Sequence, residues 1–127
     1  MTTQIAHLYA TGCLAIVFFQ IALIGGAPLG RYTQGGRYRG ALPLRGRLTA
    51  AAAIPALVLM GLAIVSAAGF PGLDWPRWTG WAVVVLQTGI MILNWMTPSQ
   101  PERAVWGPIT TIMAALALVV MTAPVPD

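Results

Sequence analysis

The sequence predicts an all-α, polytopic membrane protein, with four transmembrane helices arranged as an up-down bundle. Charged residues make up only 8% of the 127 residues, whereas they make up roughly a quarter of a typical soluble protein. So little polar material cannot cover the surface of a soluble fold of this size. The apolar residues also form four long uncharged stretches, at about residues 5–24, 48–69, 78–96 and 104–123.

Each stretch has the length that a membrane-spanning helix needs. A helix rises about 1.5 Å per residue, so about 20 residues cross a hydrocarbon core of about 30 Å. A membrane barrel would need strands that alternate polar and apolar residues, and these stretches do not alternate. We therefore expect one transmembrane domain over residues 1–127, with the first stretch retained as a span rather than cleaved as a signal peptide.

Turn and capping residues lie where these spans should begin and end. Glycine and proline follow the first span at residues 25–28 and the second at residues 69–72. Asp74 is a candidate N-cap for the third helix. Ser99, followed three residues later by Glu102, has the spacing of a capping box that opens the fourth helix.

The arginines predict an orientation. The chain has no lysine, and six of its seven arginines fall in the segments that join the first helix to the second and the third to the fourth. The positive-inside rule places residues 25–47 and 97–103 in the cytoplasm, with both termini and residues 70–77 outside. The five tryptophans also fall near the expected membrane interfaces, where an indole is favoured: Trp75, Trp78, Trp81, Trp95 and Trp106.

Composition also indicates the kind of organism and membrane in which the protein is found. The absence of lysine beside abundant alanine, glycine, proline and arginine is typical of a GC-rich bacterial genome, so we expect a multi-pass protein of the bacterial cytoplasmic (plasma) membrane, the inner membrane of a cell with two. The positive net charge of +4 lies beside apolar spans rather than on a soluble face. Anionic lipid headgroups are therefore the expected counter-charge, and nucleic acid is not.

Polar residues within the spans have two interpretations. Gly80, Gln87 and Asn94 recur every seven positions and should form one stripe that faces the bundle interior. The stripe can hydrogen-bond a neighbouring helix, or it can line a substrate site. On the first helix, His7 should be an interfacial residue, and Gln20 should face a different side from His7 and make a packing hydrogen bond.

The segment 25–47 is the strongest candidate for a binding surface. It contains seven glycines, two prolines, two tyrosines and five arginines in 23 residues. Glycines allow a close approach to a partner, and arginines offer forked donors to phosphate. The alternative is a purely topological anchor. The candidate lipid- or partner-binding residues are Arg31, Tyr32, Arg37, Tyr38, Arg39, Arg45 and Arg47.

Several function classes are disfavoured by what the chain lacks. Cys13 is the only cysteine and His7 the only histidine, so dithiol, metal-thiolate and bis-histidine haem sites are not expected. Asp74, Glu102 and Asp127 are expected outside the spans, which removes the membrane carboxylate that small four-helix exporters use. We expect no catalytic residues, no metal and no cofactor.

Two loop motifs resemble those of small bacterial four-helix integral membrane proteins without an assigned activity. The first is Gly26-Ala27-Pro28-Leu29-Gly30, followed by Gly35-Gly36 and Leu42-Pro43. The second is Asn94 followed by residues 97–103 and Trp106-Gly107-Pro108. The resemblance covers the whole chain and implies four helices, with no activity attached.

We therefore expect a non-catalytic accessory or structural membrane protein that contacts anionic lipid or a partner through its basic loop. The alternatives are a small oligomeric transporter or channel along the polar stripe, and a lipid-modifying membrane enzyme. Four short helices bury little surface among themselves, so we expect a homo-oligomer or a subunit of a membrane complex.

Overall fold

A computed structural model describes residues 1–125 and confirms the all-α fold class. The described part of the chain contains four helices, each long and apolar enough to cross a membrane, and two short 3-10 turns. The long helices are α1 (Thr2–Ile24), α2 (Leu44–Ala67), α3 (Arg77–Met96) and α4 (Gln100–Thr122). The 3-10 turns are η1 (Gly30–Tyr32) and η2 (Gln34–Gly36).

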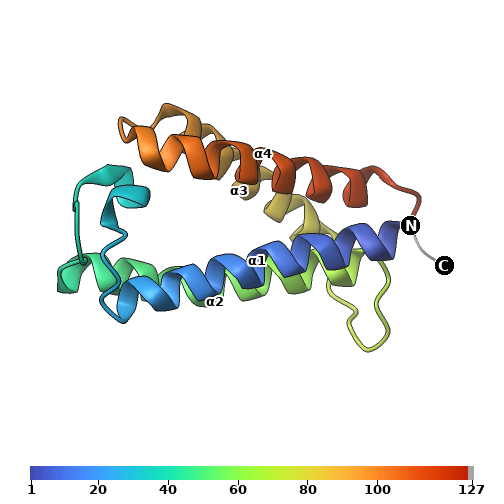
Figure 1. Ribbon diagram of the computed structural model, residues 1–127. Coiled ribbons are helices and arrows are strands. Elements are labelled where there is room, and N and C mark those ends of the chain that lie inside the picture. Colours follow the sequence, from blue (N-terminus) through green and yellow to red (C-terminus); the bar gives the residue numbers. More distant parts are fainter. Residues whose placement is uncertain (126–127) are drawn as a thin grey trace.

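The helices form two antiparallel hairpins, α1 with α2 and α3 with α4 (Figure 1). The start of α1, the end of α4 and the connection 68–76 share one end of the bundle, which we call the turn end. The connections 25–43 and 97–99 share the other end, which we call the arginine end because six of the seven arginines lie there. Arg77 lies at the turn end, where its guanidinium donates to the Met121 carbonyl oxygen at 2.9 Å.

The turn-end half of the bundle is closely packed. Its core draws on all four helices and on Ala68, just beyond α2. Close packing depends on Gly80, because a Cβ at this position would overlap the side chain of Met121 and touch Ala67. The buried core residues are Ala6, Tyr9, Cys13, Met60, Ala63, Ile64, Val65, Ala68, Val83, Met113, Ala117, Val120 and Met121.

Towards the arginine end the two hairpins diverge, and the connection 25–43 crosses between them (Figure 1). A second, smaller cluster of Leu23, Leu42 and Ala50 anchors this connection to α1 and α2. On α2, residues 50–53 and Ala56 are all alanine. The methyl side chains of Ala53 and Ala56 are too short to fill the space that the divergence leaves.

The outer surface is that of a multi-pass membrane protein. Large apolar side chains such as Leu14, Phe18 and Val85 are exposed on the helices, as lipid-facing residues would be. Trp78, Trp81 and Trp95 are exposed as expected for interfacial indoles. Two tryptophans differ from that expectation, since Trp75 packs on the turn-end core and Trp106 turns into the bundle. Asp127 lies outside the described residues.

Three helices begin three or four residues before the start expected from hydropathy. Helix α1 begins at Thr2 rather than 5, α2 at Leu44 rather than 48, and α4 at Gln100 rather than 104. The reason is the same in each case, because polar or charged residues can occupy the first turn of a helix before the apolar run starts. Hydropathy marks the apolar run and not the helix.

The expected caps are borne out only in part. The prediction that Asp74 caps α3 was wrong, because the N-cap of α3 is Pro76 without a side-chain hydrogen bond. Ser99 does cap α4, its Oγ accepting from the Glu102 amide at 3.3 Å. Glu102 does not complete the capping box, since its carboxylate accepts instead from the amide of Gly35 at 3.3 Å.

Candidate functional site

The connection 25–43 folds onto the start of α4. The Ser99 hydroxyl donates to the Arg31 carbonyl oxygen at 2.5 Å, and the Trp106 indole N–H donates to the Tyr32 carbonyl oxygen at 2.8 Å. With the Gly35–Glu102 bond, three contacts join segments about 70 residues apart in the sequence. The basic loop is therefore an ordered part of the fold.

Two glycines make close approaches possible, Gly30 within the loop itself and Gly36 between the loop and the start of α4. A Cβ at Gly30 would overlap the backbone carbonyls of Tyr38 and Gly40, and one at Gly36 would overlap the Ser99 side chain. Gly36 also has a φ of +70°, which L side chains rarely adopt. The sequence interpretation assigned the loop glycines to a partner, but these two bring the loop against its own chain.

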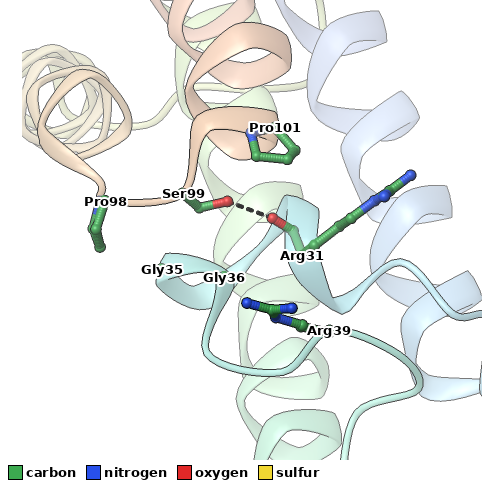
Figure 2. A pocket seen from close by; sticks show the side chains of 7 residues that line it. All are labelled: Arg31, Gly35, Gly36, Arg39, Pro98, Ser99 and Pro101. Carbon is green, nitrogen blue, oxygen red and sulfur yellow. Dashed lines mark hydrogen bonds between the residues drawn. The ribbon is translucent and has the colours of Figure 1, made fainter.

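A surface pocket of about 440 Å³ lies between this loop and the connection that precedes α4. Figure 2 shows the Ser99–Arg31 hydrogen bond in its wall and the Arg39 guanidinium below Gly36, with the Arg31 side chain extending to the other side. Both arginine side chains are exposed. We call this the arginine pocket; its lining residues are Arg31, Gly35, Gly36, Arg39, Pro98, Ser99 and Pro101.

The other tyrosine and arginine candidates of the loop lie outside this pocket. Tyr32 stacks under the Arg31 guanidinium, 5.0 Å from the ring centroid, and Tyr38 packs on the small cluster of Leu23, Leu42 and Ala50. Arg47 lies in the first turn of α2, where its Nε donates to the Leu42 carbonyl oxygen at 2.8 Å.

Arg37 and Arg45 are exposed elsewhere on the arginine end, Arg45 in the first turn of α2. Of the seven loop candidates, only Arg31 and Arg39 line this pocket.

The polar stripe on α3 points inward at Gly80 and Gln87, which are buried. The Tyr9 hydroxyl donates to Gln87 Oε1 at 2.8 Å, an interhelical bond of the expected kind. Asn94 behaves differently from the expectation, because its Nδ2 donates to the Ile90 carbonyl of its own helix at 2.8 Å. His7 is exposed, and its ring lies edge-on to Phe70 with centroids 5.8 Å apart.

Gln87 and Asn94 also line an inner cavity of about 350 Å³, which draws on all four helices and on the loop. One wall is apolar, formed on α2 and α3 by Ala53, Ala56, Leu57, Met60, Leu86 and Ile90. The polar and aromatic lining residues are Phe19, Gln20, Tyr32, Thr33, Gln87, Asn94, Glu102, Trp106 and Thr110.

Sequence reasoning did not place Gln20, Glu102 or Trp106 at this cavity. Gln20 faces a different side of α1 from the exposed His7, as expected, and lines the same cavity as Gln87. Glu102 was expected in a capping box outside the spans, and it is only 7% exposed. Trp106 was assigned to the interface, and its ring packs edge-on against Phe19 at 4.9 Å. Gln87 and Asn94, two polar residues inside an apolar span, were the signals in the sequence that pointed to this cavity.

Comparison with known proteins does not identify a relative: no protein-family model, curated protein or solved structure matches the chain. Within residues 1–125, no three His, Cys, Asp or Glu side chains group as metal ligands would. Inference about function therefore rests on the arginine pocket and the inner cavity.

Proposed function

We propose that the protein is a non-catalytic accessory protein of a bacterial cytoplasmic membrane that binds the phosphate of an anionic lipid headgroup in the arginine pocket. The observation that carries the proposal is that Arg31 and Arg39, from different parts of one loop, both line a pocket at the helix ends. The Arg39 guanidinium lies below Gly36 (Figure 2), and the Arg31 guanidinium lies over Tyr32. Guanidinium groups are suited to phosphate because their donors match its oxygens in pairs.

The proposal includes an orientation. Six arginines at one end of the bundle and one at the other favour placing the arginine end in the cytoplasm and the turn end, with both termini, outside. The cytoplasmic leaflet carries the anionic lipids that the pocket would bind. Labelling of a cysteine introduced at Gly35 from outside intact cells would contradict this orientation.

Binding of an added anionic lipid tests the pocket. We expect the double variant Arg31→Gln/Arg39→Gln, in nanodiscs of phosphatidylcholine, to bind added phosphatidylglycerol roughly thirtyfold more weakly, since each basic residue contributes about 1 kcal/mol beside anionic lipid. Arg37→Gln/Arg45→Gln is the matched control, because it removes the same charge outside the pocket. Equal weakening by both pairs would reduce the loop to a general electrostatic anchor.

Inorganic phosphate separates the lipid from its headgroup. If the pocket binds lipid, millimolar phosphate should displace little phosphatidylglycerol, because the acyl chains hold the lipid beside the site. Full displacement by free phosphate would instead indicate a soluble phosphate ligand.

Transport through the chain's own interior is a second candidate, favoured by the position of Gln87 and Asn94 on one cavity. Such a pathway would lie inside one chain and not between subunits, because Gln87 is only 2% exposed in the single chain and therefore does not face a neighbouring subunit. Gln87→Leu/Asn94→Leu should then abolish flux of the transported solute in proteoliposomes while leaving assembly intact. Unchanged flux would exclude this candidate.

A further inference from the structure

We infer that the inner cavity is a binding site for a neutral, hydroxyl-bearing lipid such as an acylglycerol. Its polar head would occupy the cavity and its acyl chain would leave between α2 and α3. This ligand and its position inside the bundle are separate from the anionic lipid proposed at the arginine pocket.

The size and position of the cavity suit the head of such a lipid. Its volume of about 350 Å³ lies near the lower end of the range of ligand pockets, roughly 300–1,000 Å³. The Phe19 and Trp106 rings, packed edge-on, form a rigid aromatic side, and the alanines of α2 leave the opposite side open. The lining thus combines apolar contact with a few placed polar groups, as ligand sites do.

The polar lining offers both a donor and acceptors. Gln87 uses its carbonyl oxygen to accept from Tyr9, which leaves its amide N–H groups as donors towards the cavity. Asn94 uses its amide nitrogen within α3, which leaves its carbonyl oxygen as an acceptor. The Glu102 carboxylate is a second acceptor, since one of its oxygens accepts from Gly35. A hydroxyl group can satisfy both kinds of partner, whereas a ketone or an ester alone can only accept.

The charges favour a neutral ligand. None of the described residues that line the cavity is an arginine, although six arginines lie at this end of the bundle. An anionic head would therefore lie beside Glu102 without a cation to neutralise it, and burying an unpaired charge is costly. A cationic head would have to pass through the hydrocarbon phase and the apolar wall of α2 and α3 to reach the cavity, which is costly for a charge. Amide and hydroxyl partners require no charge on the ligand.

The exposed lining residues locate the entrance. Of the lining residues, only Ala56 on α2 and Leu86 on α3 are exposed. We therefore place the opening of the cavity between these two helices. At the arginine end the loop lies over it, with Tyr32 and Thr33 in the lining. A ligand from the hydrocarbon phase can enter this way without crossing the loop.

Photo-crosslinking tests the site directly. A monoacylglycerol with a diazirine in its acyl chain would be added to the whole protein in phosphatidylcholine vesicles, and the labelled residues mapped by mass spectrometry. We expect saturable labelling around Ala56, Leu86 and Ile90, displaced by unlabelled decanoylglycerol. Methyl decanoate, which has the ester but no hydroxyl, should compete at least tenfold less well.

Variants separate the cavity from the lipid surface. Ala53→Phe should fill the cavity and reduce saturable labelling at least tenfold, whereas Ala52→Phe, on the exposed side of the same helix, should leave it unchanged. Asn94→Leu, of similar volume, should weaken decanoylglycerol binding roughly two- to tenfold through loss of one hydrogen bond. It keeps the test decisive if Ala53→Phe does not fold.

Two results would overturn the inference. One is labelling spread evenly over lipid-facing residues such as Val85 and not displaced by decanoylglycerol, in a protein whose circular dichroism is normal. The other is equal competition by methyl decanoate, which would remove the assignment of a hydroxyl-bearing ligand. Neither result bears on the arginine pocket, whose test uses phosphatidylglycerol and different variants.

Discussion

The two halves of this bundle use the same helices for different purposes. At the turn end, Gly80 and Ala63 allow the hairpins to meet, and thirteen buried side chains fill the space between them. At the arginine end, the alanines of α2 have the opposite effect, because the hairpins there have already diverged and small side chains leave a cavity. Small residues therefore bring helices together only where the opposing helix supplies side chains that reach them.

Enlarging one alanine in each half gives the largest contrast. Ala63 is 3% exposed in the turn-end core, so Ala63→Leu should lower the free energy of unfolding by about 1–3 kcal/mol through overpacking. Ala53→Leu extends into the cavity and should change that free energy by less than about 0.5 kcal/mol. Unfolding in mixed detergent measures both variants. Equal destabilisation would show that the arginine-end half is as closely packed as the other.

Gly80 tests whether close helix contact at the turn end matters. Gly80→Leu should destabilise the protein by about 1–3 kcal/mol, because the new side chain must displace the buried end of Met121. Gly89→Leu is the control on the same helix, since a Cβ there has no neighbour within 4 Å. The same unfolding assay should show little loss for the control. A tolerated Gly80→Leu would contradict the packing described for this end.

The Tyr9–Gln87 bond lies where the packed half meets the cavity. We expect a double-mutant cycle of Tyr9→Phe and Gln87→Leu to give a coupling free energy of about 0.5–2 kcal/mol. The hydroxyl and the amide are both buried, so neither finds water when the other is removed. A coupling near zero would mean that the pair does not connect α1 to α3.

Glu102 gives the smallest expected effect. Glu102→Gln keeps an acceptor for the Gly35 amide but removes its charge, which should cost no more than about 1 kcal/mol. The more sensitive measurement is hydrogen exchange of the Gly35 amide, which should become faster in the variant. The Gly30 amide, bonded to the Gly40 carbonyl at 3.0 Å, should exchange as before and serves as the internal control.

Sequence reasoning recovered the four spans because their signal is local: a membrane-spanning helix needs about 20 predominantly apolar residues in a row. It also recovered Gln87 as an interhelical partner. It did not place Gln20 or Glu102 at the inner cavity, because their surroundings depend on how far the two hairpins diverge, and the sequence of one span does not contain that information. Likewise, the spacing of Ser99 and Glu102 predicted a capping box, and a loop about 70 residues earlier competed successfully for the glutamate.

The three contacts between the basic loop and the start of α4 have a mechanical consequence. The chain joins the loop only to α1 and α2, so covalent connectivity alone would let the α3–α4 hairpin swing away at this end. The bonds of Ser99, Glu102 and Trp106 to the loop backbone act as a tether across that gap. Widening the bundle at the arginine end therefore requires these three bonds to break first.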